Sequence, residues 1–128
     1  MRVLIQRASE ASVKIEGKIH GEINRGLVVL LGIESEDTHD DINWLVRKLI
    51  GLRIFNDEDG KMNESIADIG GEFLVISQFT LHASTKKGNR PSYIKAARPE
   101  VAIPLYEEFI QILRKESNLK VDTGAVSY

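Results

Sequence analysis

The apolar run at residues 73–76 is the feature that most constrains the fold. It holds four consecutive apolar residues and follows the Gly70-Gly71 pair after one intervening residue, Glu72. Such a run after a chain-breaking pair is typical of a strand buried on both faces. Ser77, Gln78 and Thr80 then place neutral hydrogen-bonding side chains at the carboxyl end of this strand. A buried polar group without a partner costs about 1–3 kcal/mol. These side chains therefore either bind a ligand or fix the following loop.

Further strands are predicted on the N-terminal side of this run. Residues 27–33 are a second nearly continuous apolar run and predict another central strand. Residues 2–8, 11–16 and 19–23 are predicted as strands too, the second with apolar and polar residues alternating, and residues 16–18 form a plausible tight turn. We expect these N-terminal strands to be antiparallel.

Two amphipathic helices complete the predicted domain. The first begins with Asp37 or Thr38 as its N-cap and extends to about residue 54. The second begins at Pro99 and ends near Asn118, before a short final strand at residues 119–124. The apolar face of the second helix comprises Val101, Leu105, Tyr106, Phe109, Ile110, Ile112 and Leu113. This order predicts an α+β domain in which two helices pack on a mainly antiparallel sheet.

Composition excludes several classes of protein. The 128 residues suit one domain, and the absence of cysteine excludes disulfides and thiolate chemistry. The N-terminus does not resemble a signal peptide and no apolar run approaches the roughly 18–20 residues of a membrane span, so we expect a cytoplasmic protein without membrane contact. The net charge is −2, but residues 86–98 hold five basic residues and no acidic one. This basic loop indicates a local anion partner or a solvated loop without a ligand.

No standard catalytic motif is present. His20, His39 and His82 lie on separate segments without metal-ligand spacing, so no metal or other cofactor is expected. Thr80 is a candidate nucleophile with His82 two residues later as its base. The alternative, which we favour, is hydrogen bonding to a developing oxyanion by side chains or backbone N–H groups of this segment.

The segment Ser77-Gln78-Phe79-Thr80-Leu81-His82-Ala83 resembles the SQFTLxA motif of the D-aminoacyl-tRNA deacylases. Other segments match that family in the same order along the chain: residues 4–8, 26–32, 53–55, 60–63 and 90–93, followed by Ala97. Several motifs in register over most of the chain make the resemblance specific.

The resemblance implies a homodimeric hydrolase that cleaves the ester joining a D-amino acid, or misplaced glycine, to the 3′ end of tRNA, as chiral proofreading in translation. It also implies roles for individual residues. Ser77, Gln78, Phe79 and Thr80 would be catalytic and would line the ester site. The substrate would also be bound by Arg7, Leu81, Ala83 and Ala97. The tRNA would be bound by Lys86, Lys87, Arg90 and Lys95.

The sequence departs from the family pattern at its end. Val121-Asp122-Thr123-Gly124 resembles the start of the TGxFGAxM stretch, which residues 125–128 do not continue. The NxGPVT segment, whose Gly–cis-Pro pair excludes L-amino acids in the family, is absent. We therefore expect one domain over residues 1–128 that lacks C-terminal strands. Two alternatives remain: a non-catalytic RNA-binding module, and an interaction protein that uses an open sheet edge.

Overall fold

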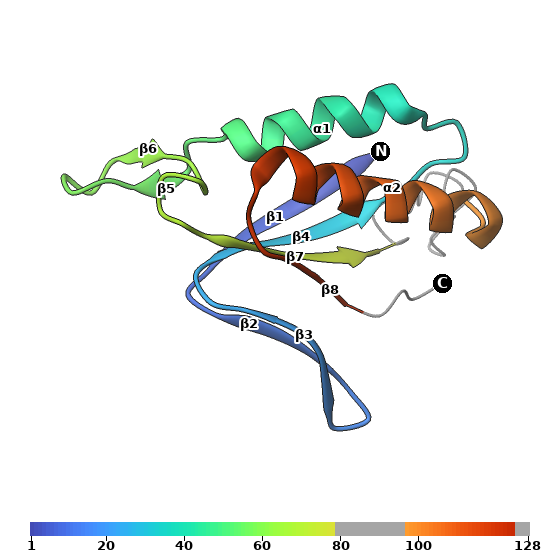
Figure 1. Ribbon diagram of the computed structural model, residues 1–128, viewed down its shortest axis with the longest axis horizontal. Helices are drawn as coiled ribbons and strands as arrows, with labels where there is room; N and C mark the ends of the chain where they lie inside the picture. The colour runs from blue at the N-terminus through green and yellow to red at the C-terminus, as the bar shows by residue number, and fades with distance from the viewer. Residues whose placement is uncertain (79–96, 125–128) are drawn as a thin grey trace, which may run out of the picture.

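The fold has two helices on one face of a central sheet and a β-hairpin on the other face (Figure 1). A computed structural model describes residues 1–78 and 97–124. These residues form eight strands and two helices. Among them, no helix combines the length and the hydrophobicity that crossing a membrane requires.

The central sheet has four strands in the order β1-β4-β7-β8. Their bounds are Arg2–Ala8 for β1, Gly26–Gly32 for β4, Glu72–Ser77 for β7 and Val121–Thr123 for β8. The two apolar runs are the inner strands β4 and β7, and their helix-facing residues Leu27, Val29, Leu31, Phe73 and Val75 are buried. The prediction of two central strands is confirmed.

The sheet is mixed, and this differs from the expected mainly antiparallel arrangement. β1 pairs antiparallel with β4, whereas β4–β7 and β7–β8 are parallel pairs. Helix α1 (His39–Gly51) lies between β4 and β7 in the chain, and α2 (Pro99–Ser117) lies between β7 and β8. Each helix carries the chain back to the end of the sheet where the previous strand began, so the next strand is parallel. The α+β class with two packed helices is confirmed.

Both helices bury the faces that pack on the sheet, with two corrections to the prediction. Thr38 is the N-cap of α1, and its N–H donates to the Asp41 carboxylate at 2.8 Å. Helix α1 ends at Gly51, three residues before the expected end, because Leu52 adopts an extended conformation. In α2, Val101 is 39% exposed, and the buried position in the first turn is Ala102 instead.

The hairpin of β2 (Ala11–Ile15) and β3 (Lys18–Ile23) packs against the face of the sheet opposite the helices (Figure 1). Its turn is the predicted one, with Glu16 and Gly17 at φ values of 50° and 79°. The hairpin approaches the sheet at Gly21, where a Cβ atom would lie 2.4 Å from the carbonyl oxygen of Thr123. The N–H of Glu22 donates to Asp122 at 2.9 Å, which ties β3 to β8.

A smaller hairpin follows α1. Its strands are β5 (Phe55–Asn56) and β6 (Met62–Glu64). The Asp57 carboxylate accepts the N–H groups of Asp59 and Lys61 at 2.9 and 3.0 Å, so protein groups close this acidic turn. The hairpin places Phe55, which is 3% exposed, beside the end of the sheet where β1 finishes.

Replacing Gly26 by alanine tests how closely the chain is packed at the start of β4. A Cβ atom there would lie 1.8 Å from the carbonyl oxygen of Glu72, which is backbone and cannot rotate away. We expect Gly26→Ala to lower the free energy of unfolding by about 3 kcal/mol or more.

The matched control is Gly51→Ala, where nothing lies within 4 Å of the added atom. This variant should keep the wild-type stability or gain up to about 1 kcal/mol, because alanine favours the helix. Urea denaturation measures both. Equal stability of the two variants would contradict the packing at Gly26.

Candidate active site

Ser77 and Gln78 lie at the carboxyl end of β7, where the sheet ends beneath the start of α2. Ser77 is 4% exposed and lies opposite Leu31 in the parallel pairing with β4. The N–H of Gln78 donates to the carbonyl of Leu31 at 2.8 Å, so backbone pairing continues one residue past the strand. Ser77, the first polar residue after the apolar run, is therefore buried, Gln78 is half-buried, and Thr80 lies outside the described residues.

Ala97 belongs to the same end of the sheet. Its N–H donates to the carbonyl of Ile33 at 2.8 Å, and Ile33 directly follows β4. Ala97 is 7% exposed. Since Leu31 pairs with Ser77 and Ile33 follows Leu31 by two residues, the structure brings Ala97 and Ser77 to one region from distant parts of the sequence.

Tyr106 attaches helix α2 to this end of the sheet. Its hydroxyl donates to the carbonyl of Val75 at 2.9 Å, and the N–H of Gly124 donates to the same carbonyl at 3.1 Å. Helix α2 and the chain after β8 are thus attached to β7 two residues before Ser77. Sequence reasoning placed Tyr106 on the apolar face of α2 but missed its hydroxyl bond, for which the sequence carries no local signal.

Arg7 lies at the opposite end of the sheet. It pairs with Leu27, which pairs with Phe73, four residues before Ser77 along β7. At the rise of a strand, four residues correspond to roughly 13 Å. The Arg7 side chain instead donates from Nη1 to the carbonyl of Ile54 at 3.0 Å. Within one chain, the structure does not bring Arg7 to Ser77.

All the other predicted site residues fall outside the described part of the chain. They are Phe79, Thr80, Leu81, Ala83, Lys86, Lys87, Arg90 and Lys95, and the same holds for His82. Within residues 1–78 and 97–124, no group of three or more histidine, aspartate or glutamate side chains could hold a metal ion.

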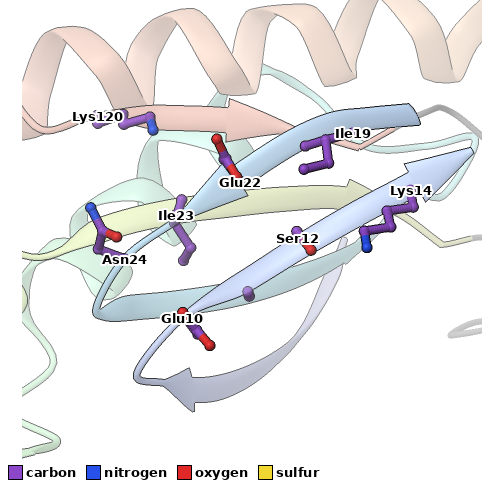
Figure 2. A pocket seen from close by; sticks show the side chains of 9 residues that line it. Glu10, Ser12, Lys14, Ile19, Glu22, Ile23, Asn24 and Lys120 are labelled. Atoms are coloured by element: carbon purple, nitrogen blue, oxygen red, sulfur yellow. The ribbon is translucent and has the colours of Figure 1, made fainter. Parts of the chain in front are cut away.

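A hollow of about 590 Å³ on the β2–β3 hairpin contains none of the predicted site residues (Figure 2). Figure 2 shows side chains of both charges around it, from the two hairpin strands and from the segment leading to β8. The labelled residues with polar side chains are Glu10, Ser12, Lys14, Glu22, Asn24 and Lys120. Its mixed charge does not select an anion or a cation, and we assign it no function.

Comparison with known proteins identifies the family. Residues 4–127 match the family described as D-Tyr-tRNA(Tyr) deacylase. A D-aminoacyl-tRNA deacylase of Flavobacterium johnsoniae is 59% identical over 124 residues, covering 97% of this chain and 83% of the relative. The deacylase of Phocaeicola vulgatus is 60% identical with the same coverage.

Two solved structures share the fold. The c-Myc DNA Unwinding Element Binding Protein is 39% identical, with a TM-score of 0.93 over 100% of this chain and 87% of that one. A probable eukaryotic D-amino acid tRNA deacylase has a TM-score of 0.81 at 16% identity, over 96% of this chain and 87% of that one, and supports the fold alone.

The fold and the family match define the class of this protein as a deacylase, a kind of hydrolase. The chain belongs to the D-Tyr-tRNA(Tyr) deacylase family. The resemblance inferred from the sequence motifs is confirmed.

Replacing Tyr106 by phenylalanine tests the attachment of α2 to β7. The change removes the hydroxyl and leaves the Val75 carbonyl with its bond from Gly124. We expect the free energy of unfolding to fall by about 1 kcal/mol, because a buried neutral hydrogen bond contributes about that amount. Urea denaturation measures this loss of stability. The control is Gln111→Ala, an exposed change on the same helix. A Tyr106→Phe variant as stable as the control would disprove the attachment.

Proposed function

We propose that this chain hydrolyses the ester bond of D-aminoacyl-tRNA, releasing the free D-amino acid and tRNA. The observation that carries the proposal is the family match over residues 4–127, together with relatives more than 50% identical that are named D-aminoacyl-tRNA deacylase. Misplaced glycyl-tRNA is a second substrate on this proposal, and the role is chiral proofreading in translation. Neither alternative from the sequence, a non-catalytic RNA-binding module or an interaction protein, is favoured by these relatives.

We assign the reaction to the carboxyl end of β7. Water adds to the ester carbonyl carbon, the bond from that carbon to the ribose oxygen breaks, and the ribose oxygen takes a proton. The developing oxyanion needs hydrogen-bond donors in a site shielded from water. The burial of Ser77 supports such a site. The N–H of Gln78 already donates to Leu31, so we assign the oxyanion donors to Phe79 and Thr80.

The first test is deacylation of D-tyrosyl-tRNA against L-tyrosyl-tRNA by the 128-residue chain. We expect release of the D ester at a rate well above that of the L ester. Equal release of both esters would contradict chiral proofreading but would still support ester hydrolysis by this chain. No release by a chain shown to be folded by circular dichroism would contradict the proposed activity.

Replacing Thr80 by alanine separates the two catalytic hypotheses. If backbone N–H groups stabilise the oxyanion, Thr80→Ala keeps those groups, and the rate of D-tyrosyl-tRNA deacylation should fall by less than about 100-fold. A nucleophilic hydroxyl predicts a loss of order 10⁴ or more. Single-turnover kinetics decide between them, with Ser12→Ala on the hairpin as a control for unrelated hydroxyl loss.

The substrate partner on this proposal is tRNA, held through the basic loop at Lys86, Lys87, Arg90 and Lys95. Each phosphate contact contributes to the salt dependence of binding. We expect Lys86→Ala and Arg90→Ala each to weaken binding of uncharged tRNA and to reduce the slope of log K against log salt by about 0.7–0.9. Lys115→Ala, an exposed change at the end of α2, is the control. Salt slopes equal to that of the control would contradict a contact between the basic loop and the tRNA phosphates.

We further propose that the protein works as a homodimer in the cytoplasm. The sheet face opposite the helices supports the dimer: Leu4 is 56% exposed there, and it pairs with the half-buried Leu30, which pairs with the half-buried Ile76. Exposed apolar residues in one place are typical of an interface. Sedimentation that shows only monomers at micromolar concentration would contradict the dimer.

A further inference from the structure

The cavity beside Arg7 is the site that the proposed function leaves without a role. Its volume is about 330 Å³, and its lining comes from three separate segments. The lining residues are Arg7, Ala8, Ser9, Arg25, Phe55 and Asn56. It lies at the end of the sheet where β1 finishes and β4 begins, because Ala8 pairs with Gly26.

Both guanidinium groups are held in place by neighbouring residues of one segment. Arg7 donates from Nη1 to the carbonyl of Ile54 at 3.0 Å. The Arg25 guanidinium carbon lies 5.6 Å from the centre of the Phe55 ring, and that ring is 3% exposed. Both side chains therefore face the cavity with most of their N–H donors still available, at little further cost in conformational entropy.

The two positive charges share the cavity without a carboxylate. In the described part of the chain, neither Arg7 nor Arg25 forms an ion pair. Glu72 donates its N–H to the Arg25 carbonyl at 3.0 Å, and its carboxylate accepts the N–H of Asn24 at 2.7 Å. Glu10, which directly follows Ser9, lines the hollow on the hairpin and not this cavity. The two guanidinium groups repel each other, and a bound anion would attract both and offset that repulsion.

We propose that this cavity binds a phosphate group. Phosphate has enough oxygens to accept from two guanidinium forks and also from the Ser9 hydroxyl and the Asn56 amide, whereas a carboxylate has only two. A cavity of about 330 Å³ also leaves room for an attached sugar. The phosphate is either part of a polynucleotide backbone or a free phosphate or mononucleotide. This inference goes beyond the proposed ester hydrolysis and does not require it.

Titration of the full chain with inorganic phosphate, followed by NMR, tests the site. We expect saturable shifts at the backbone amides of Ser9 and Asn56 and at the Nε–H groups of Arg7 and Arg25. Arg25→Met keeps the apolar stem on Phe55 and removes the charge, and it should weaken phosphate binding at least about tenfold. Arg47→Met removes an exposed charge from α1 and is the matched control.

A second titration with uncharged tRNA distinguishes the sources. Weaker tRNA binding by Arg25→Met than by Arg47→Met, with a salt slope reduced by about 0.7–0.9, assigns the phosphate to an RNA backbone. Unchanged tRNA binding with lost phosphate binding assigns it to a free phosphate or nucleotide. The site is overturned if Arg25→Met binds phosphate as wild type does, or if the shifts do not saturate and spread over the exposed basic residues. Neither result depends on deacylation.

Discussion

The parallel pairing of β4 with β7 is the constraint on which the rest of the structure depends. Both strands are apolar along most of their length, so they are stable only where both faces of the sheet are covered. Helices α1 and α2 cover one face and the β2–β3 hairpin approaches the other (Figure 1). The Val75 carbonyl joins the helix layer to the sheet by accepting from Tyr106, and it also accepts from Gly124, which follows the neighbouring strand β8.

The same pairing gives the sheet two chemically different ends. At the carboxyl end of β7, Ser77 and Gln78 are neutral hydrogen-bonding residues beside the buried Ala97. At the other end, Arg7 and Arg25 place two positive charges in one cavity. Neutral hydrogen-bonding groups at a partly buried strand end suit the stabilisation of a developing oxyanion, and a cationic cavity suits an anion that does not react. On our proposals, the chemistry and the phosphate contact therefore lie at opposite ends of β7.

This separation bears on the role that the family resemblance implies for Arg7. Four residues of strand separate its position from Ser77, and its side chain is bonded to Ile54. Arg7 therefore has no direct access to the carboxyl end of β7 in its own chain. In the homodimer that we propose, support of the substrate pocket by Arg7 would have to act across the interface or through the RNA backbone.

The sequence by itself determined most of the segments that form strands and helices, because apolar periodicity and capping are local; the short strands β5 and β6 were not predicted. The runs at residues 27–31 and 73–76, a helix N-cap at Asp37 or Thr38 and the turn at Gly17 all follow from residues close together in the chain. The family was also evident from motifs in register. Only the tertiary structure decided that β7 is parallel to β4, that Ala102 rather than Val101 is buried, and that Arg25 lies beside Arg7. These outcomes depend on crossover connections and packing between distant segments, for which the local sequence carries no signal.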